Sequence, residues 1–69
     1  MKISARNQIP GKVVEVIKGA TTAHVKIDVG GGTIITASIT NEAVDDLRLK
    51  SGSPATAIVK ASDVMLGVS

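Results

Sequence analysis

The sequence predicts an all-β protein with one short helix, and three observations support this prediction. The chain has 69 residues, which suffice for one domain (1–69) built around one core. Apolar and polar residues alternate along most of it, as they do in half-buried strands. Glycine-containing breaks separate the alternating runs, and helical spacing occurs in one place, after Thr40.

Two strands joined as a hairpin are predicted in the first half of the chain. Lys12–Lys18 alternates in part, with Val14 and Val16 on one face. Ala23–Val29 alternates fully, since its four apolar residues share one face and its histidine, lysine and aspartate share the other. The connection Lys18–Thr22 contains a glycine that can adopt positive φ, so we expect a tight turn there.

A second hairpin is predicted at the triple glycine Gly30–Gly32. Three residues without side chains interrupt the pattern before a β-branched run, Thr33–Ile39, resumes it as a third strand. A phosphate-binding loop would need a following helix and a Gly-Lys-Ser/Thr ending, and the sequence has neither. We therefore interpret the triple glycine as a turn.

The second half of the chain predicts one helix and two further strands. Thr40 can cap a helix whose apolar residues, through Leu47, follow helical spacing. Leu49–Pro54 has the composition of a turn, after which Ala55–Lys60 is predicted as a fourth strand and Val64–Leu66 as a short fifth.

This order of elements fits a small five-stranded barrel of the OB type, with one short helix between strands three and four. An SH3-like barrel is the alternative. Hydrophobic residues make up 43% of the chain but include no Phe, Trp or Tyr, so the core must consist of smaller side chains. A chain of this length gains little net stability from one core, and without cysteine it has no disulfides. We therefore expect self-association to add stability.

The composition argues against catalysis. An enzyme of hydrolysis or transfer needs a nucleophile with a base, paired carboxylates in a cleft, or a metal. His24 is the only imidazole, on the polar face of its strand, and without cysteine it cannot form a metal cation site within one chain. The acidic residues Glu42, Asp45 and Asp46 belong to the expected solvated face of the helix. We expect no catalytic residues.

Charge and hydropathy also argue against nucleic acid and membrane as partners. Single-stranded nucleic acid is bound by basic grooves with aromatic platforms, whereas this chain has a net charge of +2 and no aromatic residue. No apolar stretch approaches the roughly 20 residues that span a bilayer, and the N-terminus lacks the apolar region of a signal peptide. We expect a cytoplasmic protein.

Two polar clusters, Ser4–Gln8 and Lys60–Asp63, remain as candidates for a binding site. Each combines a cation with hydroxyl or amide donors. A tetrahedral oxyanion of charge −2 needs one or two cations and several N–H and O–H donors, and three or four such hydrogen bonds support affinity near the micromolar range. The same residues also suit ordinary polar strand ends, so spacing alone leaves both interpretations open.

The two ends of the chain also carry a pair of motifs. Met1–Val14 includes Ser-Ala-Arg-Asn-Gln, and Ala57–Met65 includes Val-Lys-Ala-Ser. Together they resemble the molbindin family, the stand-alone Mop domain, and the resemblance covers the whole length. Pro10 departs from the family pattern and bears on the pairing of the first strand. Three shorter segments also fit the family: Lys18-Gly19, Gly30–Gly32 and Ser38–Thr40.

The resemblance implies a cytoplasmic binding protein for the oxyanions molybdate or tungstate, with a role in storage or homeostasis. It implies a homohexamer, a trimer of dimers, that holds the anions between subunits and needs no covalent cofactor. An oxyanion sensor or carrier module that acts with a partner protein is the alternative. The residues implied at the interfacial oxyanion site are Ser4, Ala5, Arg6, Thr40, Lys60, Ala61 and Ser62. A second site, built largely from main-chain amides, is implied at Lys18, Gly19 and Ala20.

Overall fold

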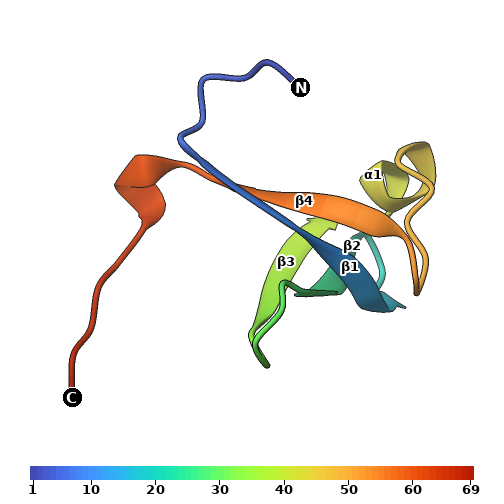
Figure 1. Cartoon of the computed structure of the whole chain (residues 1–69). Helices are drawn as coiled ribbons and strands as arrows, with labels where there is room; N and C mark the ends of the chain where they lie inside the picture. Colours follow the sequence, from blue (N-terminus) through green and yellow to red (C-terminus); the bar gives the residue numbers. More distant parts are fainter.

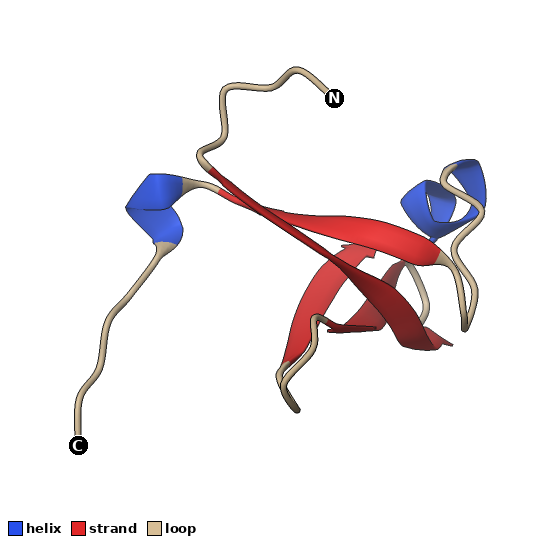
Figure 2. Cartoon of the chain, in the orientation of Figure 1, coloured by secondary structure: helices blue, strands red, loops and turns tan.

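A curled four-stranded antiparallel sheet with one short helix forms the body of the protein, as a computed structural model of all 69 residues shows (Figures 1 and 2). The strands lie in the order β3-β2-β1-β4. The elements are β1 (Asn7–Lys18), β2 (Thr22–Asp28), β3 (Ile34–Thr40), α1 (Asn41–Asp46), β4 (Pro54–Val59) and a single 3-10 turn, η1 (Ala61–Asp63). The all-β class and the helix between the third and fourth strands are confirmed. No helix has the length and hydropathy needed to cross a membrane.

Strand β1 is longer than predicted because it has two successive partners. Its first half pairs with β4, from Asn7 opposite Val59 to Lys12 opposite Pro54, and its second half pairs with β2. The register shifts between Val13 and Glu15, which marks a bulge just after the change of partner. A bulge bends a strand and increases its twist, so the sheet curls at this position.

The predicted fifth strand, Val64–Leu66, does not form within the chain, and this part of the prediction is wrong. After β4 the 3-10 turn η1 redirects the backbone, and the last residues run away from the sheet (Figure 1). An isolated segment has no ladder of hydrogen bonds to join, so its alternation alone cannot make it a strand.

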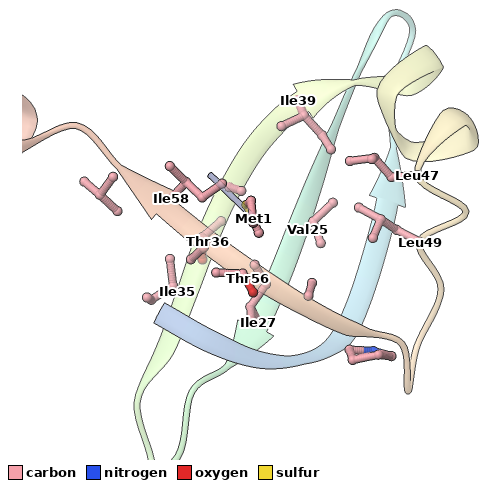
Figure 3. A pocket seen from close by; sticks show the side chains of 15 residues that line it. Met1, Val25, Ile27, Ile35, Thr36, Ile39, Leu47, Leu49, Thr56 and Ile58 are labelled. Atoms are coloured by element: carbon pink, nitrogen blue, oxygen red, sulfur yellow. The ribbon is translucent and has the colours of Figure 1, made fainter. Parts of the chain in front are cut away.

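The sheet remains open between its two edge strands. β3 and β4 stand at opposite ends of the strand order, and the apolar groove between them, with a volume of about 590 Å³, is shown in Figure 3. Twelve of its fifteen lining residues are hydrophobic, and none is charged. The barrel is therefore a half-barrel in the single chain.

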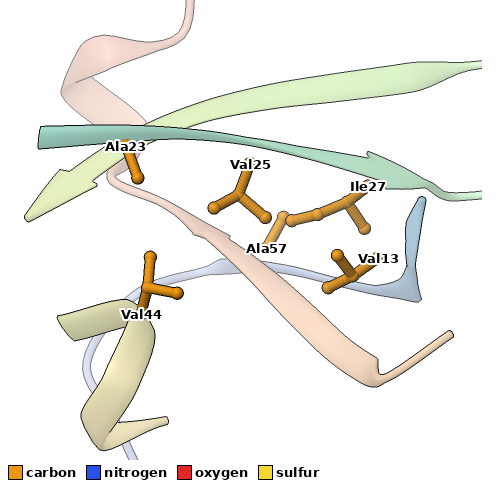
Figure 4. Packing of buried hydrophobic residues seen from close by; sticks show 6 residues of the cluster. All are labelled: Val13, Ala23, Val25, Ile27, Val44 and Ala57. Atoms are coloured by element: carbon orange, nitrogen blue, oxygen red, sulfur yellow. The ribbon is translucent and has the colours of Figure 1, made fainter. Parts of the chain in front are cut away.

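The core lies on the concave side of the sheet (Figure 4) and is small. Its six buried residues are Val13, Ala23, Val25, Ile27, Val44 and Ala57. All four strands and the helix contribute to it or pack against it, with Val44 of α1 covering one end. Because the chain has no aromatic residue, its core consists of small aliphatic side chains, as the composition predicts.

Candidate functional site

The pairing of β1 with β4 brings the two predicted polar clusters to the same end of the sheet (Figure 1). Asn7 is opposite Val59 at the end of this ladder, and the Asn7 side chain donates a hydrogen bond from Nδ2 to the Val59 carbonyl oxygen at 3.2 Å. Arg6 precedes the first residue and Lys60 follows the second. The fold thus joins, within one chain, cations that are more than fifty positions apart in the sequence.

This end of the sheet, which we call the cationic end (Ser4–Arg6 and Lys60–Ser62), contains unused hydrogen-bond donors. The backbone N–H groups of Ala61 and Ser62 donate no hydrogen bond within the chain, whereas the N–H of Asp63 donates to the Lys60 carbonyl oxygen at 2.9 Å. Neither Arg6 nor Lys60 forms an ion pair. Two cations, two free amides and nearby hydroxyls are the groups that a doubly charged oxyanion requires.

Thr40 does not lie at the cationic end. It ends β3 opposite Thr22 of β2, and this end of β2 adjoins Lys18, at the far end of β1 from Asn7. Its Oγ1 accepts a hydrogen bond from the Ala43 N–H at 3.0 Å and so caps α1, which leaves the hydroxyl proton free to donate. Within one chain Thr40 therefore cannot share an anion with the cationic end.

The second predicted site, the turn Lys18, Gly19 and Ala20, has fewer free groups. The Gly19 N–H donates to the Thr22 carbonyl oxygen at 2.7 Å, whereas the Ala20 N–H donates no hydrogen bond. Lys18 Nζ lies 2.6 Å from Asp45 Oδ1, so a carboxylate already neutralises part of the positive charge of this turn.

Asn41 is a residue of this region that sequence reasoning missed. Its Nδ2 donates to the Gly19 carbonyl oxygen at 3.0 Å and its backbone N–H donates to the Thr21 carbonyl oxygen at 2.9 Å, so Asn41 fixes the turn against α1. Its Oδ1 is buried without a partner. In the sequence, the feature that indicates this role is the position of Asn41 directly after the capping residue Thr40. A side-chain amide at that position can still reach a neighbouring backbone group.

His24 and the carboxylate side chains form no metal-binding cluster. His24 is exposed on β2, with Ile17 and Ser38 as its neighbours in the ladders. No three side chains of His, Cys, Asp or Glu lie together in a way that would hold a metal ion. The groove between β3 and β4 is apolar and offers an anion no charged group.

Comparison with known proteins gives consistent results. The family model of the TOBE domain matches residues 3–66. The chain is 50% identical over 68 residues to a probable molybdenum-pterin-binding protein of Haemophilus influenzae, covering 99% of each chain. It resembles the solved structure of MopII from Clostridium pasteurianum with a TM-score of 0.90 and 46% identity, over 97% of this chain and 100% of that one.

A third comparison concerns a larger protein. The cytoplasmic molybdate-binding protein ModG, solved with molybdate bound, matches with a TM-score of 0.94 and 46% identity; the match covers 100% of this chain and 49% of ModG. These likenesses confirm the predicted OB-type fold.

Proposed function

We propose that this chain, which belongs to the TOBE-domain family as a molbindin of the Mop type, binds the molybdate anion. Relatives that match it over nearly their whole length bear names that describe binding proteins for molybdate or molybdenum-pterin. ModG, about half of which this chain matches, has been solved with molybdate bound. We further propose that binding occurs without turnover.

The observation that best supports this proposal is the cationic end itself. The β1–β4 register pairs Asn7 with Val59, so Arg6 and Lys60 follow at the same end of the ladder, with no carboxylate paired to either. In the proposed site these two side chains supply the positive charge. Ser4, Ala5, Ala61 and Ser62 supply N–H and O–H donors.

The proposed site lies between subunits. In the single chain every residue of the cationic end is exposed except Ala5, which is half-buried, so water would surround an anion held there. A second copy would exclude that water and bring in the Thr40 hydroxyl, and hydrogen bonds to charge strengthen when water is removed. We propose the homohexamer, a trimer of dimers, as the assembly.

The turn Lys18, Gly19 and Ala20 is proposed as a second anion site on less structural support. The Ala20 N–H is free, but Lys18 is already paired with Asp45. An anion bound at this turn would also need hydrogen bonds from backbone amides of other subunits.

The proposed role is storage or homeostasis of molybdate in the cytoplasm. Tungstate has nearly the same charge and shape, and we propose it as a second ligand. A sensor or carrier module that delivers the oxyanion to a partner protein is the alternative, and a partner that binds only the loaded form would distinguish the two.

Thermal unfolding in the presence of different anions tests the proposal. A ligand that binds only the folded state at a hundredfold excess over its Kd adds about 2.7 kcal/mol to the free energy of unfolding. We expect molybdate and tungstate to raise the melting temperature and phosphate to change it little. Near pH 7 phosphate keeps a proton that needs an acceptor, and the proposed groups are mostly donors.

Equal shifts with all three anions would contradict a selective site. Native mass spectrometry with added molybdate gives the number of anions per assembly. If calorimetry detected no heat on addition of either molybdate or tungstate, the proposed function would be wrong.

A further inference from the structure

The cation of the second proposed anion site is already paired with a carboxylate of the same chain. Lys18 ends β1 directly before Gly19 and Ala20, and its Nζ lies 2.6 Å from Oδ1 of Asp45, which belongs to α1. The two residues are 27 positions apart, so tertiary packing brings them together. An oxyanion from solution that bound Lys18 would bring an oxygen to a similar distance, and the Asp45 carboxylate therefore competes with it.

Contacts other than this ion pair hold α1 against the turn. The backbone N–H of Asn41 donates to the Thr21 carbonyl oxygen at 2.9 Å, and its Nδ2 donates to the Gly19 carbonyl oxygen at 3.0 Å. Val44, directly before Asp45, is 3% exposed and belongs to the core (Figure 4). These contacts position α1 independently of the ion pair, and they keep the Asp45 carboxylate within reach of the turn.

Of the three carboxylates of α1, only one is paired. Glu42 and Asp46 have no cation within ion-pair distance, whereas Asp45 has. In the turn itself, the Gly19 N–H donates within the chain and the Ala20 N–H does not. The turn thus combines a free backbone donor with a cation whose partner is a side chain of the protein.

We infer that Asp45 is an internal competitor at this turn, and that its carboxylate pairs with Lys18 until an oxyanion from solution displaces it. The Lys18 side chain is 47% exposed and that of Asp45 66%, so Asp45 can turn into water when it is displaced. A doubly charged oxyanion attracts the lysine more strongly than the single charge of a carboxylate does at the same distance.

This inference rests on the second anion site of the proposed function and adds a threshold to it. Filling the turn requires the loss of an existing ion pair, whereas neither Arg6 nor Lys60 at the cationic end has a carboxylate partner. The cationic end should therefore fill at a lower oxyanion concentration than the turn.

Asp45→Asn and Asp46→Asn form a matched pair that tests the competition. Each removes one negative charge from the exposed part of α1 and keeps the shape of the side chain, but only Asp45→Asn removes the competitor. The measurement is the molybdate concentration at which the Ala20 amide resonance reaches half of its shift in NMR titration. We expect this concentration to fall about twofold to fivefold in Asp45→Asn, the range that an exposed ion pair supports, and to change little in Asp46→Asn.

Equal effects of the two variants would overturn the inference, as would an Ala20 resonance that no chain shifts on addition of molybdate. A merely structural ion pair would give a different pattern. Asp45→Asn would then lower the melting temperature without anion and leave the half-shift concentration equal to that of Asp46→Asn.

Lys18→Gln provides a further test, because without the ammonium group the Asp45 carboxylate has no cation to occupy. In the Lys18→Gln chain, adding Asp45→Asn should lower the half-shift concentration no more than adding Asp46→Asn does. An undiminished effect of Asp45→Asn in that chain would mean that its carboxylate only repels anions, and would overturn the inference.

Lys60→Ala separates this inference from the proposed function. Lys60 follows Val59, which pairs with Asn7 at the far end of β1 from Lys18. If Asp45→Asn acts as expected while Lys60→Ala leaves molybdate binding unchanged by calorimetry, the inference holds and the proposed cationic end is wrong. If Lys60→Ala weakens binding while Asp45→Asn and Asp46→Asn act alike, the cationic end holds and the inference is overturned.

Discussion

Arg6 and Lys60 adjoin the last pair of the β1–β4 ladder, Asn7 and Val59, and no ion pair neutralises either charge. Two other cations of the sheet, Lys18 and Lys26, have carboxylate oxygens at 2.6 and 3.7 Å. A cation without a carboxylate partner remains available to pair with an anion. The unpaired cations therefore support the proposed oxyanion site at the cationic end.

Replacing either cation tests this assignment. We expect Arg6→Ala and Lys60→Ala each to weaken molybdate binding by about tenfold to a hundredfold, since a hydrogen bond to a charged group contributes about 1.5–3 kcal/mol. Isothermal titration calorimetry measures the change.

Lys50→Ala is the matched control for Lys60→Ala. Lys50 is an exposed lysine without an ion pair, in the turn before β4 and outside the cationic end. Its replacement removes the same net charge and should leave the affinity nearly unchanged. Equal losses for the two lysine variants would mean that net charge, and not a site, attracts the anion.

At the scale of elements, the end of α1 contains a backbone conformation that its residue does not favour. The Leu49 N–H donates to the Val44 carbonyl oxygen at 3.0 Å and the Arg48 N–H donates to the Asp45 carbonyl oxygen at 3.1 Å, which is a Schellman motif. Arg48, at the position usually taken by glycine, has φ of 53°. A left-handed residue with a Cβ is strained.

Arg48→Gly should relieve that strain. We expect the free energy of unfolding to rise by about 0.5–1 kcal/mol, measured by urea denaturation. Gly52→Ala is the reverse control, because Gly52 has φ of 95° and an added Cβ there should lower stability. If Arg48→Gly lowered the free energy of unfolding, the Arg48 side chain would have to stabilise the fold by more than its backbone strain destabilises it.

β1 and β2 approach each other closely where β1 changes its partner from β4 to β2. A Cβ on Gly11 would lie 2.6 Å from the Asp28 carbonyl oxygen and 2.7 Å from Ile27 Cγ2. Only glycine lets β1 pass from β4 to β2 at this distance.

Gly11→Ala should therefore destabilise the fold. We expect a loss of about 1–3 kcal/mol in the free energy of unfolding, because backbone and core atoms must move apart. Gly67→Ala is the control, since nothing lies within 4 Å of a Cβ at that position. Equal stability of the two variants by chemical denaturation would contradict the close approach.

The whole molecule is more extended than a compact chain of its length. Its radius of gyration is 12.6 Å, against about 11 Å for a compact chain of this size. Both termini extend from the sheet (Figure 1), and six of 69 residues are buried. Much apolar surface, including Met65, Leu66 and Val68, is thus exposed in the single chain.

Stability should therefore depend on protein concentration. When folding is coupled to association, mass action raises the melting temperature as the concentration increases. We expect a progressive rise across a hundredfold range of concentration, measured by differential scanning calorimetry. A melting temperature independent of concentration would mean that the small core suffices for a single chain.

The sequence by itself determined the elements that depend on local order. Alternation predicted β2, a β-branched run predicted β3, the glycines predicted the turn at Gly30–Gly32, and the capping residue Thr40 marked the start of α1. The polar clusters and the family motifs were equally visible, because they consist of residues close together in the chain. Local patterns specify strands and turns since side-chain alternation and φ preferences act within a few residues.

Only the tertiary structure decided which segments meet. The register of Asn7 with Val59 joins the two polar clusters, the distant position of Thr40 separates it from them, and the open edges of β3 and β4 leave Val64–Leu66 without a partner strand. Strand pairing depends on which backbone edge is free at each place in the sheet. That property belongs to the folded sheet and has no signature in a short stretch of sequence.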